Sequence, residues 1–86
     1  MTISDIKNAI EVAVPKSTAY VADPNNDGQH FQAIVVSETF EGMLLVKQHQ
    51  MVMSALKNAF TESVHALSLK TLTPLKWNEE KSHYGY

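Results

Sequence analysis

The chain of 86 residues has the length of one small domain, enough for a modest core and too short for two. Hydrophobic residues make up 44% of it and charged residues 19%, which indicates a folded globular protein rather than a disordered one. The formal net charge of −2 argues against a protein that coats nucleic acid, although a basic stripe can be hidden in such a total. There is no cysteine, so disulfides are excluded and any thiolate bound to a metal would come from a second molecule.

The first 14 residues carry acidic side chains and lack the basic start of a secretory signal. No apolar run is long enough to span a bilayer. From these two observations we expect a soluble, cytoplasmic protein without a membrane partner.

The first expected element is a helix that ends before Pro15. Thr2 and Asp5 have the spacing of a capping box. Apolar residues recur at helical intervals and predict the buried stripe: Ile3, Ile6, Ala9, Ile10 and Ala13.

A hairpin is expected next. Residues 17–23 (STAYVAD) are typical of a short strand, and residues 24–29 (PNNDGQ) are dense in turn formers. Residues 30–37 (HFQAIVVS) are apolar on nearly both faces, which favours a central strand. Because one turn separates the two strands, they should pair antiparallel.

The second half predicts a helix, a strand and another helix. Gly42 is the expected left-handed position of a turn, and a helical pattern then runs from about Leu44 to Thr61. Residues 66–71 alternate as a strand, with the residues at 67, 69 and 71 on one side. Thr73 and Pro74 have the order of an N-cap and a first helical residue, and the polar tail from about residue 79 is expected to be mobile.

This last helix should begin with a hydrophobic staple between Leu72 and Trp77. The order of elements is helix, strand, strand, helix, strand, helix. A helix joins the last two strands, which favours a parallel pair with a right-handed crossover. The sequence therefore predicts an α+β domain over residues 1–86, with helices packed on a three-stranded mixed sheet.

Histidine is the residue type with the clearest potential for chemistry. His30 and His65 each precede an apolar strand, and the starts of parallel strands lie at one edge of a sheet, so these two rings could approach each other. For His65 two interpretations stay open: a core histidine with a satisfied ring, or a ligand offered to a partner. His49 lies beside the stripe of the long helix and favours a structural role, and His83 in the tail is expected to have none.

Catalysis by this chain alone is not expected. The four histidines lack zinc-motif spacing, and the sequence has neither a nucleophile elbow nor a phosphate-binding glycine loop. Glu79 and Glu80 are more typical of a solvated helix face than of an acid–base pair. The methionines at 43, 51 and 53 are expected in the core and at its rim.

Three segments resemble the BolA family in its short bacterial YrbA/IbaG-type form. They are "HF.AIVVS..FEG", the histidine within "KQHQ", and "HALSLKT.TP..W", and the resemblance covers residues 28 to 77. It implies a fold related to type II KH domains. It also implies a partner, a monothiol CGFS-type glutaredoxin, with which a 2Fe–2S cluster is shared while glutathione and the glutaredoxin cysteine supply sulfur.

The same resemblance implies that His65 is the cluster ligand. The second ligand of many relatives is a cysteine or histidine in the loop between the first two strands, and the cysteine position falls near Asp27. His30 is the nearby histidine and is the candidate here. Two departures, Gln48 where relatives often have arginine and Met53 where they often have tyrosine, weaken any case for phosphate binding on the long helix.

The function expected from this resemblance is an accessory role in iron–sulfur trafficking or iron and redox regulation, with a link to the stress response. No cofactor is expected in the isolated chain, which should be a monomer or a weak homodimer. The alternative is a KH-like nucleic-acid-binding regulator of transcription. The absence of a GXXG loop and the negative net charge argue against it, so any nucleic-acid binding should be weak.

Overall fold

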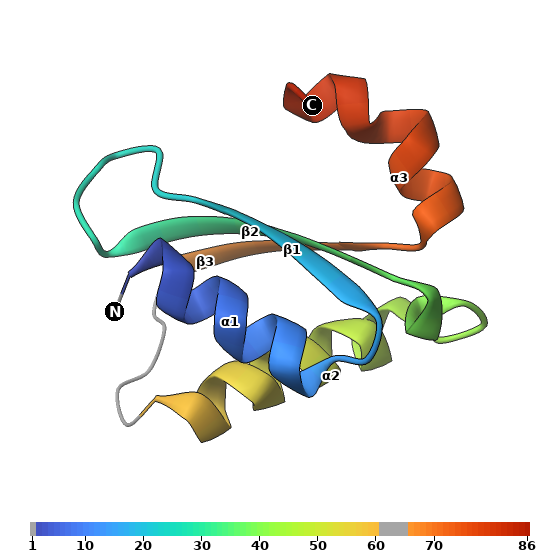
Figure 1. Ribbon diagram of the computed structural model, residues 1–86, viewed down its shortest axis with the longest axis horizontal. Coiled ribbons are helices and arrows are strands. Elements are labelled where there is room, and N and C mark those ends of the chain that lie inside the picture. Colours follow the sequence, from blue (N-terminus) through green and yellow to red (C-terminus); the bar gives the residue numbers. More distant parts are fainter. Residues whose placement is uncertain (1, 61–65) are drawn as a thin grey trace.

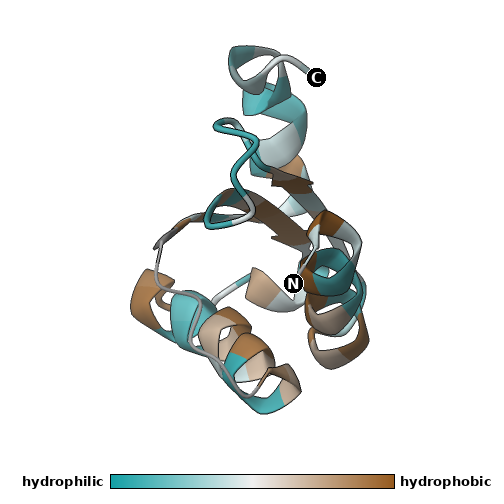
Figure 2. Ribbon diagram, turned by 90° about the vertical axis from the view of Figure 1, so that its left-hand side faces the viewer, coloured by the Kyte–Doolittle hydropathy of each residue, from teal (hydrophilic) through white to brown (hydrophobic). Residues whose placement is uncertain are grey.

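The computed structural model describes residues 2–60 and 66–86. The chain forms α1 (Ile3–Ala13), β1 (Ser17–Ala22), β2 (His30–Ser37), α2 (Leu45–Ala59), β3 (Ala66–Leu72) and α3 (Pro74–Glu80), with short 3-10 turns η1 (Glu38–Phe40) and η2 (Lys81–Tyr84). Helices α1 and α2 lie on one face of the sheet and α3 lies on the other (Figure 1). Figure 2 shows the hydrophobic strands between these two layers.

The sheet has the predicted topology. Its order is β1-β2-β3, with β2 in the centre. β1 pairs antiparallel with β2, and β3 pairs parallel with it. The apolar character of β2 on both faces is explained by this central place, because helices cover each side of it.

Helix α1 begins with the predicted capping box. The backbone N–H of Asp5 donates to Thr2 Oγ1 at 3.1 Å, and the backbone N–H of Thr2 donates to Asp5 Oδ2 at 2.9 Å. Ile6 and Ile10 are fully buried. The predicted stripe is wrong at its two ends, where Ile3 and Ala13 are exposed. At the C-terminal end, the helix stops at Ala13 and Val14 turns into the core instead.

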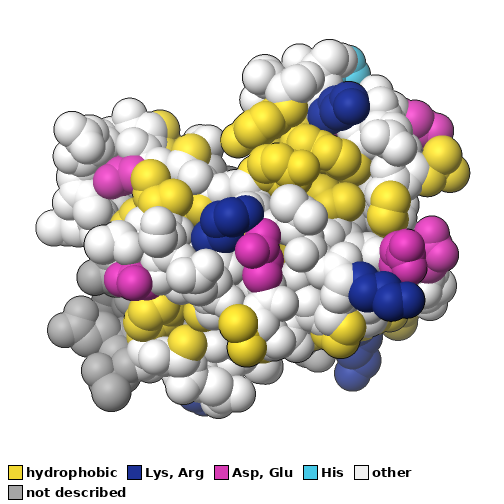
Figure 3. Space-filling view, viewed as in Figure 1, with side chains coloured by type: hydrophobic (Ala, Val, Ile, Leu, Met, Phe, Trp, Pro, Cys, Tyr) yellow, Lys and Arg dark blue, Asp and Glu magenta, His cyan; other side chains and the backbone are white. Residues whose placement is uncertain are grey.

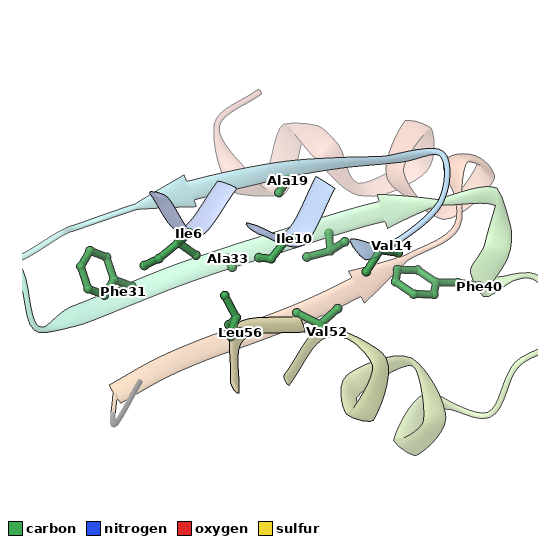
Figure 4. Packing of buried hydrophobic residues seen from close by; sticks show 10 residues of the cluster. Ile6, Ile10, Val14, Ala19, Phe31, Ala33, Phe40, Val52 and Leu56 are labelled. Carbon is green, nitrogen blue, oxygen red and sulfur yellow. The ribbon is translucent and has the colours of Figure 1, made fainter. Parts of the chain in front are cut away.

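The main core fills the space between the sheet and the first two helices (Figure 4). Every second residue of β2, from Phe31 through Ala33 to Val35, points into it. Val52 and Leu56 enter it from α2 at helical spacing, whereas Ala59 of the same helix is exposed. Burial of this apolar surface is the main stabilising contribution to the fold.

A second cluster lies on the opposite face. Leu72 and Trp77 form the predicted staple and pack with Val36. Aromatic rings extend this cluster, with Tyr20 stacked on Trp77 at 4.6 Å between ring centroids and Tyr86 tilted against both. Figure 3 shows apolar side chains gathered beneath the C-terminal helices. The structure places residues 81–84 in η2, and the mobility of this tail stays a prediction.

Helix α2 begins after a turn in which Gly42 has the predicted left-handed conformation, with φ of +76°. The helix runs from Leu45 to Ala59, one residue inside the predicted start, and Phe60 is its C-cap. The rest of the predicted helix, Thr61, lies outside the described residues. No helix among residues 2–60 and 66–86 has the length and apolar character that crossing a membrane requires.

Candidate functional site

Of the two predicted ligands, one is at the start of a strand and the other directly precedes the neighbouring strand in the sequence. His30 is the first residue of β2, and it pairs in the parallel register with Ala66, the first residue of β3. His65 precedes Ala66 in the chain and lies outside the described residues, so the structure does not test its role. The predicted adjacency of these strands is confirmed, and it brings His30 beside the residue bonded to His65.

The sequence of β2 explains why the ring of His30 is exposed. Phe31 is 4% exposed and packs in the main core, so the residues next to it in the strand point the opposite way. The side chain of His30 is 56% exposed. At this end of β2, the His30 ring is therefore exposed to solvent, while the packing of Phe31 in the core holds the backbone in place.

The loop before His30 is a compact turn built around carboxylates. Asp23 accepts backbone N–H groups from Gly28 at 2.9 Å and from Asp27 at 3.3 Å. Asn26 and Gly28 have positive φ angles of 52° and 66°, the left-handed conformation that asparagine and glycine tolerate best. The turn residues of the sequence thus form a loop with its own hydrogen bonds.

Asp27 joins this loop to the histidine. Its Oδ2 lies 2.7 Å from His30 Nδ1, and its Oδ1 accepts the backbone N–H groups of Gln29 at 2.9 Å and of His30 at 3.0 Å. These bonds, first the one from the His30 backbone, lower the pKa of Asp27 far below its ordinary value of 3.8. The carboxylate therefore stays ionised beside the imidazole ring over the whole physiological range.

An open hollow of about 550 Å³ adjoins this ring. It is bounded by the β1–β2 loop and the first residues of β2 and β3, which are Pro24, Asn25, His30, Phe31, Gln32, Leu67 and Ser68. Figure 1 shows the loop and the start of β3 at the same end of the sheet. A partner that reaches His30 would therefore meet both strands and the loop.

The other residues singled out in the sequence lie elsewhere. His49 is half-buried on α2, and His83 is exposed on η2, on the side of the sheet that α3 covers (Figure 1). Met43 and Met51 pack against the main core while Met53 is 40% exposed, which confirms the predicted division between core and rim. Glu79 is exposed and Glu80 half-buried on α3.

The described part of the chain offers one imidazole at this edge rather than a complete metal site. Among residues 2–60 and 66–86, no three side chains of His, Cys, Asp or Glu gather as a metal-binding group. An exposed ring with one nitrogen fixed by a carboxylate suits a single ligand position in a site completed by other molecules. Sequence reasoning missed the role of Asp27, and the signal was its spacing of three residues before His30 in a turn.

Comparison with known proteins agrees with this architecture. The family model described as BolA-like protein matches residues 5–76. The chain is similar to the acid stress protein IbaG of Escherichia coli strain K12, with 32% identity over 87 aligned positions that cover both chains fully. Among solved structures, a bolA protein homologue from Coxiella burnetii superposes with a TM-score of 0.76 at 38% identity, covering 91% of this chain and 97% of the other.

The fold also occurs as part of a larger protein. The BolA domain of SufE1 from Arabidopsis thaliana is similar to this chain with a TM-score of 0.70 and 29% identity, over 86% of this chain and 93% of that domain. The matched residues 5–76 run from α1 into α3 and so include all three strands. On the strength of this match and of the fold, the chain belongs to the BolA family.

Proposed function

We propose that this protein is an accessory factor in iron–sulfur trafficking that binds a monothiol CGFS glutaredoxin and shares a 2Fe–2S cluster with it through His65. His30 is the proposed second ligand. The observation that carries the proposal is the parallel pairing of His30 with Ala66, the residue bonded to His65. Family membership adds the expectation that this edge of the sheet faces the partner.

The donor set of the chain fits a shared cluster. A 2Fe–2S cluster needs four ligands, and this chain has histidine but no cysteine to give. The thiolates would come from the glutaredoxin and from glutathione. The cluster supplies one-electron redox chemistry when bound, and replacing thiolate by neutral imidazole raises its reduction potential.

Imidazole ligation also supports a role in stress. Protonation near the ordinary pKa of histidine, about 6.5, competes with metal binding, so such a cluster is released more readily than one held by four thiolates. The related protein of Escherichia coli carries the name acid stress protein. We infer that this chain acts in the stress response by holding a cluster that can be transferred or sensed.

The test is complex formation with the purified partner. The isolated chain, mixed with holo-glutaredoxin and glutathione, is expected to give a heterodimer on size exclusion and an altered visible circular dichroism spectrum. If the spectrum is unchanged and the two proteins elute separately, the proposal is wrong.

Three single substitutions locate the ligands. His65→Ala should keep the fold and abolish the characteristic spectrum of the heterodimer, and His30→Ala should produce a smaller change of the same kind. His83→Ala is the matched control, because His83 is exposed on η2 and should leave the spectrum intact. A large loss of thermal stability for His65→Ala, with an unaltered spectrum, would instead indicate a structural histidine.

A further inference from the structure

We propose that Asp27 is a positioning residue that fixes the ring of His30 so that Nε2 is the atom offered to a metal. The proposal deepens the function proposed above and rests on it for the identity of the metal. It concerns His30, the proposed second ligand. Its geometric part concerns described residues alone and is testable without any partner.

The hydrogen bonds of Asp27 leave its carboxylate little freedom. Oδ1 accepts two backbone N–H groups, from Gln29 at 2.9 Å and from His30 at 3.0 Å. Oδ2 lies 2.7 Å from His30 Nδ1. Rotation of the carboxylate would break the backbone bonds, so the oxygen that faces the ring stays in place.

Asp27 is itself supported by the rest of the loop. Its backbone N–H donates to Asp23 Oδ1 at 3.3 Å, and the next residue, Gly28, donates to Asp23 Oδ2 at 2.9 Å. The side chain of Asp27 is 34% exposed, compared with 56% for His30. A held carboxylate therefore lies behind a ring whose outer part is open to a partner.

This contact determines the tautomer of the neutral ring. An ionised carboxylate only accepts hydrogen bonds, so Nδ1 must carry the proton that lies between them. The lone pair is then on Nε2, away from Asp27. Histidines that bind metals commonly donate their other N–H to a carboxylate in this way, which fixes the ring and increases its basicity as a ligand.

The competing explanation is that Asp27 only caps the turn through its backbone bonds. The variant Asp27→Asn separates the two roles. Asparagine keeps an Oδ1 for the N–H groups of Gln29 and His30, so its amide nitrogen takes the place of Oδ2 beside Nδ1. That nitrogen donates, so the ring must accept at Nδ1 and carry its proton on Nε2.

The first measurement uses the isolated chain labelled with ¹⁵N, at a pH about two units above the ordinary pKa of histidine, ~6.5. Two-bond ¹H–¹⁵N spectra should show the Nδ1–H tautomer for His30 in the wild type and the Nε2–H tautomer in Asp27→Asn. The control is Glu79→Gln, which removes the same charge from an exposed position on α3, outside the loop, and should keep the wild-type tautomer.

Unchanged amide shifts for the strands would show that the Asp27→Asn fold is intact. The inference is overturned if the wild-type ring already carries its proton on Nε2, or if Asp27→Asn leaves the tautomer unchanged.

The second measurement adds holo-glutaredoxin and glutathione. Asp27→Asn should change the visible dichroism of the heterodimer in the same direction as His30→Ala, while Glu79→Gln should not. A switched tautomer with an unaltered cluster spectrum would overturn the role of His30 Nε2 as a ligand. Failure of the wild type to form any complex would refute the proposed function and leave the tautomer result standing by itself.

Discussion

Gln48 shows how a single side chain can connect three parts of this fold. Its Nε2 donates to the carbonyl oxygens of Phe40 at 3.2 Å and Met43 at 3.0 Å, and its Oε1 accepts from Thr71 Oγ1 at 2.7 Å. Both Gln48 and Thr71 are buried. The residue therefore ties the turn before α2 to the last residues of strand β3. Glutamine at this position is a buried structural group and does not form a surface for phosphate.

We predict that Gln48→Leu lowers the free energy of unfolding by about 2–3 kcal/mol, because it removes three hydrogen bonds of the interior, to the carbonyls of Phe40 and Met43 and from the hydroxyl of Thr71. Thermal or urea unfolding measures the loss. Gln50→Leu is the control, since Gln50 is exposed on the same helix and should change stability little. Equal losses in the two variants would contradict the role assigned to the buried amide.

The carboxylate of Asp27 leads to a prediction about how the stability of the fold depends on pH. Its pKa is lowered in the folded chain by hydrogen bonds from the His30 and Gln29 backbone and from the His30 ring. The stabilisation by the ionised form is complete above the ordinary pKa of 3.8 and is lost as the pH falls below it. Melting temperatures from neutral to acid pH should therefore fall less steeply in Asp27→Asn than in the wild type, and parallel curves would refute the assignment.

Among the elements, β1 is an edge strand whose outer side is partly covered by helix α1. Glu11 Oε2 accepts the backbone N–H of Ala19 at 2.8 Å, and Lys7 Nζ donates to the carbonyl of Ala19 at 2.8 Å. The two side chains also form an ion pair at 2.7 Å. A helix thus occupies the hydrogen-bonding positions at which another strand could pair.

For this contact between α1 and β1 we predict that Glu11→Gln destabilises the fold by about 1 kcal/mol, because a charged acceptor is replaced by a neutral one. The Lys7 ammonium and the Ala19 N–H lower the pKa of Glu11, so its contribution is present above the ordinary pKa of 4.5 and is lost at lower pH. Unfolding measured at neutral and acid pH tests both points. Glu79→Gln is the control, because Glu79 is exposed on α3, and it should change neither stability nor its dependence on pH.

The elements themselves could be predicted because local signals specify them. Thr2 with Asp5 and Thr73 with Pro74 mark helix starts. The apolar run of β2 and the period of two in β3 mark strands. The contacts of four polar side chains could not be predicted, because each depends on residues that only the folded chain brings into place. These side chains are Lys7, Glu11, Gln48 and Asp27. The same reason explains the errors at Ile3 and Ala13, where a correct helical period says nothing of where the covering sheet ends.

At the scale of the whole molecule, one sheet is shared by two apolar clusters that differ in composition. The main core is largely aliphatic, whereas the far side combines Trp77 with three tyrosines around the end of the chain. Lys70 lies 5.8 Å above the ring of Tyr84 on that side. His30 belongs to neither cluster and lies at the edge where β2 and β3 begin.

The net charge of the chain is relevant to whether it binds nucleic acid. With a net charge of −2 and no GXXG loop, we expect DNA binding that is weak, insensitive to sequence and strongly reduced by added salt. Fluorescence anisotropy with two unrelated duplexes at low and physiological salt measures it. Submicromolar, sequence-specific binding at physiological salt would favour a transcriptional regulator over the iron–sulfur role.

The parallel pairing of β2 with β3 also has a consequence for the time at which the site comes into being. The β1–β2 hairpin closes over a short loop, whereas Ala66 must return to His30 after the whole of α2 has intervened. Contacts between residues so far apart in sequence form later and more slowly than local ones. A chain still emerging from the ribosome can thus complete its hairpin while the edge formed by the first residues of β2 and β3 does not yet exist, so a ligand that needs both strands can bind only after β3 has paired.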